Sequence, residues 1–197
     1  MKVTQVKCPQ CDLPIYMRQK DDFFYCSSCG TIHVRGIHGV ERIPYEIANF
    51  RPGTPLDDCH YIPFWRLQCD FQIKSRSVEG GYLHKLSNAL KGGDDGGQLR
   101  IFVPASDLDI AVFRYWSVNL TVNNPRYSVR DDFADVQRMP ATTGREEAIE
   151  LADFIAVTLE AEKPGTLQYL DYDLEVQEAK VIYLPFISSP SGLHLAV

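Results

Sequence analysis

The clearest pattern of apolar and polar positions lies between residues 146 and 160 and is typical of an amphipathic helix. Its apolar stripe recurs at helical spacing and contains Ala148, Ile149, Ala152, Ile155, Ala156 and Leu159. Aspartate and glutamate occupy positions between them, so one face is predicted to pack on a core and the other to meet water. Pro164 then ends the helix, because proline cannot continue it.

A second helical segment is predicted from about Leu108 to Leu120, where the residues are apolar all round and often β-branched. Such a segment is either a deeply buried helix or partly strand, and periodicity does not decide between them. Each helical segment is preceded by a proline and then by a serine or threonine. This hydroxyl residue stands three positions before a carboxylate, as in a capping box. The two capping boxes, Ser106 with Asp109 and Thr143 with Glu146, indicate either an internal duplication or simply two element boundaries.

Strands are predicted where aromatic and aliphatic residues adjoin a proline, since proline interrupts the hydrogen bonding of a sheet. An early antiparallel pair covers residues 60–79 and 99–104. A late hairpin pairs the alternating segment 170–176 with residues 181–186 and uses residues 178–180 as its turn.

These elements predict an α+β fold, with antiparallel strands and two main helices in a domain that covers residues 59–197. Residues 36–58 contain six glycines and prolines, too many for a regular element, and are interpreted as a linker. Residues 1–35 form a separate N-terminal unit that is defined by its cysteines.

Two C-x-x-C pairs, Cys8 with Cys11 and Cys26 with Cys29, dominate this N-terminal unit. Each pair places two sulfurs in one turn, and two such turns supply the four thiolates of a closed tetrahedral zinc site. The 14 residues between the pairs suit a short hairpin, and residues 31–34 predict a third strand. One zinc ion held by four sulfurs is structural, because no position is left for water or substrate.

The residues after the two pairs, Asp12 and Gly30, are expected to have positive φ angles, which glycine adopts freely and aspartate tolerates. Three alternatives to the zinc site are a rubredoxin-like iron site, a redox-active dithiol, and a site in which His33 replaces a cysteine. Two further cysteines, Cys59 and Cys69, are interpreted as small core residues rather than as a nucleophile or a second metal site. Asp94-Asp95 lacks the further ligands of a calcium loop and is interpreted as part of a solvated turn.

Cys8, Cys11, Cys26, Cys29 and Gly30 together resemble the zinc ribbon family over about 35 residues. The resemblance implies a three-stranded ribbon with four cysteine ligands, and it implies little about function, since ribbons bind nucleic acids and proteins alike. Over most of its length the chain also resembles a group of uncharacterised bacterial zinc-ribbon proteins with Tyr-x-Pro-Phe-Trp strands, here residues 61–65. That second resemblance implies a bacterial cytosolic protein and transfers no catalytic residue.

The charge distribution does not favour nucleic acid as the partner. The net charge is −6, and residues 1–42, with six basic and four acidic side chains, carry no basic stripe that would displace counterions. As an alternative function, the ribbon hairpin would bind nucleic acid through Lys7, Tyr16, Arg18, Lys20 and Phe23.

The preferred hypothesis is a non-enzymatic adaptor or assembly component that acts through protein–protein contacts. The sequence contains no nucleophile elbow, P-loop or dinucleotide-binding motif, so we assign no catalytic residue. An enzyme with an unrecognised site in the C-terminal domain is the remaining alternative. We expect no membrane span, because no run of 18 apolar residues occurs, and a cytoplasmic location, because the cysteines are spaced for a metal.

Overall fold

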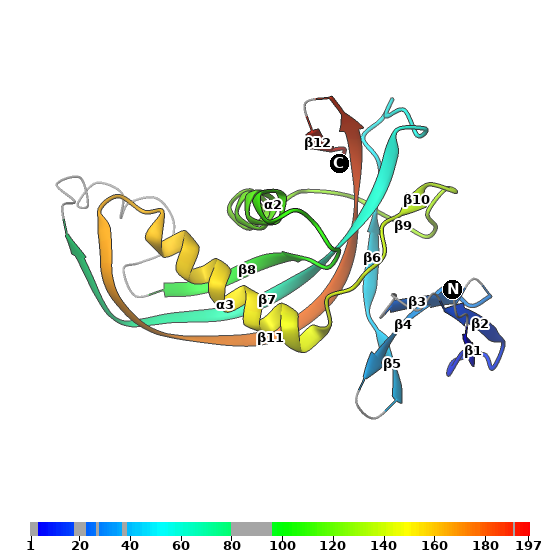
Figure 1. The fold of residues 1–197 in the computed structure, drawn as a ribbon, viewed down its shortest axis with the longest axis horizontal. Helices are drawn as coiled ribbons and strands as arrows, with labels where there is room; N and C mark the ends of the chain where they lie inside the picture. Colours follow the sequence, from blue (N-terminus) through cyan, green and yellow to red (C-terminus); the bar gives the residue numbers. More distant parts are fainter. Residues whose placement is uncertain (1–3, 18–22, 27, 37–38, 80–95, 191) are drawn as a thin grey trace.

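The structure is a computed structural model that describes residues 4–17, 23–26, 28–36, 39–79, 96–190 and 192–197 (Figure 1). Its described residues form two helices and a mostly antiparallel set of strands, which confirms the predicted α+β class. Asp94-Asp95 lies outside the described residues.

A seven-stranded mixed sheet forms the body of the protein, and its long central pair is β7 (Cys59–Glu79) and β11 (Thr166–Ser189). These two strands run antiparallel along their whole length, from the pair Ile187 and Cys59 to the pair Thr166 and Glu79. The other strands of this sheet are β6 (Tyr45–Ala48), β8 (Gly96–Pro104), β9 (Val129–Arg130), β10 (Gln137–Arg138) and β12 (Gly192–Leu195).

The two helices, α2 (Ile110–Asn123) and α3 (Arg145–Ala161), pack on opposite faces of this sheet. Alternate residues of a strand point to opposite faces. In β7, Trp65 belongs to the core beneath α3, whereas its neighbour Phe64 belongs to the core beneath α2. The helices also contact each other, and Arg114 of α2 forms an ion pair of 3.0 Å with Glu162 after α3.

The N-terminal region forms two small antiparallel sheets rather than one hairpin-based ribbon sheet. In the first sheet β1 (Thr4–Lys7) pairs with β2 (Pro14–Met17). In the second, β4 (Thr31–Gly36) lies between β3 (Phe23–Cys26) and β5 (Gly39–Ile43). The short hairpin expected between the two cysteine pairs would join residues 15–17 to residues 23–25, but these segments lie in different sheets, where β2 pairs with β1 and β3 pairs with β4.

Residues 36–58, predicted to be an irregular linker, contain all of β5 and all of β6. The glycines and prolines of this segment lie at strand ends, between β5 and β6 or in the loop that follows β6, where they do not interrupt a ladder. β6 joins the main sheet by pairing in parallel with residues 181–183 of β11. Residues 36–58 thus contribute β5 to an N-terminal sheet and β6 to the main sheet, which they connect.

The predicted C-terminal hairpin is wrong. Residues 166–189 form the single strand β11, and residues 178–180 continue its pairing with β7. The register with β7 shifts between Val176 and Glu178, so a bulge at Gln177 precedes the polar residues that resembled a turn. The strand that returns beside β11 is β12, which pairs with residues 186–189.

The two predicted capping boxes are also wrong, although both helices form. The carboxylate of Asp109 caps α2 by accepting a hydrogen bond from the Ala111 N–H at 2.9 Å. Gly144 precedes α3 without a side-chain cap. The two hydroxyl residues lie in the loops instead, where Ser106 donates a hydrogen bond of 2.8 Å to the Pro140 carbonyl.

Candidate metal centre

The four cysteines of the two C-x-x-C pairs converge in the structure, as their spacing predicts. The sulfurs of Cys8, Cys11, Cys26 and Cys29 all lie within 4.8 Å of one another. The distances from Cys8 to Cys29 and from Cys11 to Cys26 are both 3.6 Å. A tetrahedral ion with bonds of about 2.3 Å to sulfur requires sulfurs roughly 3.8 Å apart. The cluster therefore has the size and the ligand type of a tetrahedral thiolate site.

The two turns that carry these cysteines have matching backbone geometry. In the first turn the Asp12 N–H donates to the Cys8 carbonyl, and in the second the Gly30 N–H donates to the Cys26 carbonyl, both at 2.8 Å. The φ angles of Asp12 and Gly30 are 59° and 67°, as expected for the residue that closes each turn. Two equivalent turns thus present their sulfurs to one point from two separate sheets.

Two polar side chains of β4 extend this site beyond the cysteines. The Thr31 hydroxyl lies 3.2 Å from the Cys29 sulfur, and Nε2 of His33 lies 3.3 Å from the Cys8 sulfur. Donors at these positions stabilise thiolates and fix their orientation. The four sulfurs already complete a tetrahedral set, and His33 lies beside one of them, which is the position of a supporting residue rather than of a replacement ligand.

His33 is almost completely buried, and among the described residues its Nδ1 atom has no hydrogen-bond partner. Burial lowers the pKa of this imidazole, and the positive charge of Arg42 acts in the same direction. In the neutral ring only one nitrogen carries a proton. A proton on Nε2 makes His33 a donor to the Cys8 sulfur and leaves the unpartnered Nδ1 as an acceptor.

The four thiols interact strongly in the protein without a metal. The Thr31 hydroxyl lowers the pKa of Cys29 to about 6, against the opposing effect of burial. For Cys11 a backbone hydrogen bond at Leu13 acts to lower the pKa, but burial and the three neighbouring thiols raise it to about 12. Four thiolates this close repel one another, so full ionisation requires a cation among them.

The second turn of this centre is anchored to the main sheet. The hydroxyl of Tyr45 in β6 donates a hydrogen bond to the Gly30 carbonyl. On the same side of β3, Phe23 packs edge-on against Trp65 of β7, with 5.6 Å between ring centroids. Tyr25 packs edge-on against Phe133 at 5.5 Å. No sequence pattern indicated Tyr45, because a contact between residues 15 positions apart in two sheets has no local pattern.

The structure describes the side chains of only two of the five residues of the nucleic-acid alternative, Lys7 and Phe23. The side chain of Phe23 is buried against Trp65, so its ring is not available to stack on a base. Lys7 is exposed but lies 3.2 Å from the carboxylate of Asp12. Tyr16 lies on β2, and Arg18 and Lys20 lie outside the described residues.

Cys59 and Cys69 lie in the main hydrophobic core, away from the metal centre. Both are buried, and burial raises the pKa of each thiol, that of Cys69 to about 11. A buried thiol that stays protonated is neither a nucleophile nor a metal ligand. Their predicted role as small core residues agrees with this placement.

Comparison of the chain with protein-family models, with curated proteins and with solved structures finds no match. The metal centre is therefore characterised by its own geometry: a cluster of four cysteines that can hold a metal ion, as in a zinc ribbon. Among the described residues, neither helix is long and apolar enough to cross a membrane.

Proposed function

We propose that the protein is a non-enzymatic adaptor or assembly component, in which zinc holds the N-terminal lobe and a partner protein binds the outer face of α2. Cys8, Cys11, Cys26 and Cys29 would ligate the ion, which would supply structural crosslinking and no reaction step. The preference for zinc rests on the four-sulfur donor set and on the short separation of the two cysteine pairs.

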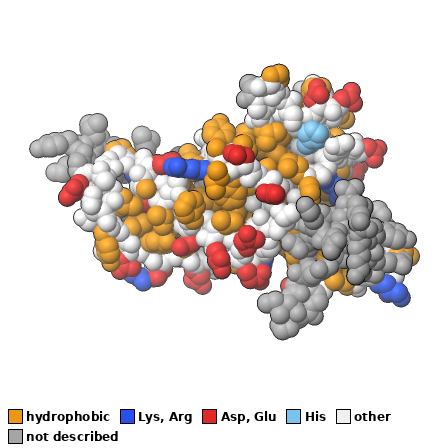
Figure 2. All heavy atoms as spheres, in the orientation of Figure 1, with side chains coloured by type: hydrophobic (Ala, Val, Ile, Leu, Met, Phe, Trp, Pro, Cys, Tyr) orange, Lys and Arg blue, Asp and Glu red, His pale blue; other side chains and the backbone are white. Residues whose placement is uncertain are grey.

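The observation that carries the proposal is an apolar stripe on the solvent side of α2. Trp116 and Leu120 are buried beneath the helix, but Tyr115 and Val122 on its outer side are 59% and 63% exposed. These two residues line up at helical spacing with Ala111 and Val118. A helix that is apolar on both sides normally has both sides covered. Figure 2 shows the hydrophobic side chains that gather over the helices.

The proposal is tested with the double variant Tyr115→Ser, Val122→Ser. Its matched control is Leu56→Ser, Val129→Ser, which removes two other exposed apolar side chains from loops and from β9. Crosslinking in the native host followed by purification should recover a partner with the wild-type and control proteins and lose it with the α2 variant. Equal recovery with both variants contradicts the proposal, as does catalytic turnover in a broad hydrolase and nuclease screen.

A further inference from the structure

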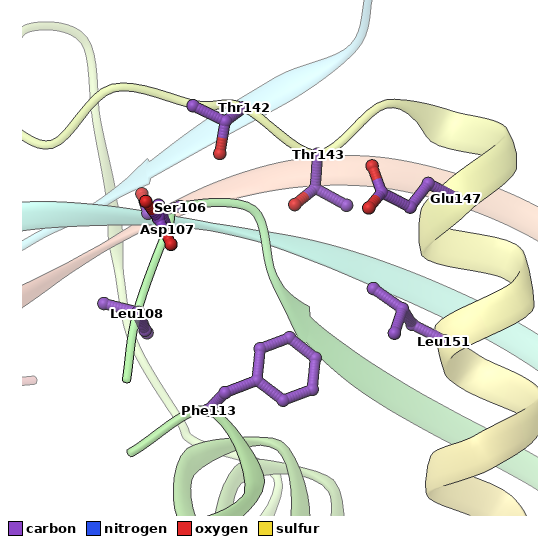
Figure 3. Close-up of a pocket in the computed structure, with 8 residues that line it drawn as sticks. All are labelled: Ser106, Asp107, Leu108, Phe113, Thr142, Thr143, Glu147 and Leu151. Carbon is purple, nitrogen blue, oxygen red and sulfur yellow. The ribbon is translucent and has the colours of Figure 1, made fainter. Parts of the chain in front are cut away.

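A pocket of about 350 Å³ opens between the loop before α2, the loop before α3 and the two helices (Figure 3). Its size is at the lower end of the roughly 300–1,000 Å³ typical of ligand sites. The lining residues are Ser106, Asp107, Leu108, Phe113, Thr142, Thr143, Glu147 and Leu151. The pocket is not part of the metal centre, because no strand of the N-terminal sheets lines it.

The lining combines apolar side chains with side-chain oxygen atoms. Leu108, Phe113 from α2 and Leu151 from α3 supply the apolar part, and in Figure 3 Phe113 lies below the space and Leu151 to its right. The carboxylates of Asp107 and Glu147 are exposed. No lysine or arginine lines the pocket. Such a lining suits a group with an apolar stem and a positively charged end.

The surface around the pocket is also both apolar and negatively charged. Ile110 on the first turn of α2 and Phe154 on α3 are 83% and 59% exposed. The exposed carboxylates near the start of the two helices are those of Asp107, Asp109, Glu146, Glu147 and Glu150. Two arginines lie nearby: Arg114 of α2 is paired with Glu162, and Arg145 is the exposed first residue of α3. The apolar surface is therefore bordered mainly by negative charge.

We propose that this pocket receives a lysine or arginine side chain of the partner protein, from a basic amphipathic helix that lies along the stripe of α2. This inference rests on the proposed function and adds the chemistry of the partner. Phe113 lies on the opposite side of α2 from the stripe, so a side chain of the partner helix would reach the pocket around the start of α2, where Leu108 lies three positions before Ala111. The charge complementarity also disfavours nucleic acids, anionic membranes and a second copy of this acidic chain as occupants.

The probe for the test is a fluorescein-labelled helical peptide of 18 residues (roughly the length of five turns) made of leucine and lysine at helical spacing. A second peptide carries glutamate in place of every lysine. Binding to the full-length protein is followed by fluorescence anisotropy at several salt concentrations. The lysine peptide should bind, more weakly as salt rises, and the glutamate peptide should not. A carbodiimide should crosslink a peptide lysine to Asp107 or Glu147.

The decisive comparison uses the variant Asp107→Asn, Glu147→Gln against the control Asp57→Asn, Glu175→Gln. Both pairs remove two exposed carboxylates, so the net charge of the protein changes equally. The pocket variant should weaken peptide binding by about tenfold or more, and the control by less than about twofold. Equal weakening in both proteins means that only net charge attracts the peptide and overturns the inference, as does an absence of binding.

The same assay separates this inference from the proposed function. If Tyr115→Ser, Val122→Ser abolishes binding and the pocket variant does not, α2 is still a docking surface but the pocket does not recognise the cation. A dimer in solution that is broken by Tyr115→Ser, Val122→Ser overturns the inference in favour of a second copy of the chain.

Discussion

The two faces of the sheet β3–β4–β5 belong to two hydrophobic cores of very different size. On the face toward the cysteines, Phe24 and Cys26 belong to a cluster with only two other buried residues, Cys8 and Ile15. On the opposite face, Phe23 and Ile32 belong to the largest core of the protein. A core of four residues cannot offset the entropy of ordering β1, β2 and two turns. We therefore expect a metal ion to stabilise the first face and hydrophobic burial the second.

Because its two faces belong to different cores, we expect that the N-terminal region does not unfold as one independent module. Strand alternation allows neighbouring residues of β3 to serve different cores, since Phe23 and Phe24 point to opposite faces. A β3–β5 sheet that shares the main core should survive events that destroy the metal centre. The predictions below test this division, from the largest effect to the smallest.

Loss of the metal should have the largest effect. Structural zinc supplies about 10–16 kcal/mol in small peptides. Chelation, or the substitution Cys26→Ser, should abolish hydrogen-exchange protection in β1 and β2, whereas β7 and β11 keep theirs. β4 should keep partial protection, because its other face remains in the main core. The control Cys59→Ser should instead lower global stability with the metal retained. Loss of β7 protection together with β1 would contradict the division into two cores.

Phe23 and Phe24 allow the two faces to be tested one at a time. Phe23→Ala removes a ring from the contact with Trp65 and should cost about 3–5 kcal/mol of unfolding free energy, with the metal still bound. Phe24→Ala should instead accelerate metal release, because its ring covers the cysteine cluster. Urea unfolding and metal release to a chromophoric chelator measure the two effects. The same outcome for both variants would mean that the two cores are one.

The sequence predicted those parts of the molecule that depend on local chemistry. The cysteine cluster and the positive φ angles of Asp12 and Gly30 follow from residues within two short turns. The helix α3 was predicted because its apolar stripe has a clear period. The sequence pattern also predicted the pairing of β7 with β8, because each strand is a long β-prone segment.

The parts that could not be predicted depend on distant partners. Residues 178–180 look like a turn, but β7 offers a continuous edge to which β11 pairs through a bulge. The segment 36–58 looks like a linker because its prolines are frequent, yet β6 acquires a parallel partner about 135 residues later in the chain. By contrast, the position of Thr31 and His33 beside the sulfurs could have been predicted, because both residues follow Cys29 closely along the sequence.

His33→Phe should weaken metal binding by roughly 10–100-fold, the usual effect of losing a residue that orients a metal ligand. The phenylalanine ring fills a similar space but donates no hydrogen bond to the Cys8 sulfur. His33→Gln keeps an N–H donor and should recover part of the affinity. The control is His60→Phe, which alters a histidine of β7 away from the cluster. Competition with a chelator measures the affinity, and a wild-type value for His33→Phe would mean that the ring only fills space.

Metal affinity should also decrease as the pH falls, because protons compete with the metal for the individual thiolates. At neutral pH the metal must displace the proton of Cys11, whose pKa is raised to about 12, whereas Cys29, with a pKa near 6, is already ionised. Below about pH 6 the proton of Cys29 must be displaced as well. Each pH unit of further acidification should then lower the affinity by about an additional factor of ten. Thr31→Val should move this change toward higher pH, and an unchanged profile would contradict the role of Thr31.

The smallest effect is expected at the hydrogen bond that joins the metal centre to the main sheet. Tyr45→Phe removes the hydroxyl that donates to the Gly30 carbonyl and should cost about 1 kcal/mol. Because the ring itself remains, the core should be unchanged, and the loss should appear as faster hydrogen exchange at the second cysteine turn. Tyr169→Phe, on an exposed ring of β11, serves as the control. Equal acceleration of exchange in β7 would mean that Tyr45 stabilises the main core rather than the second cysteine turn.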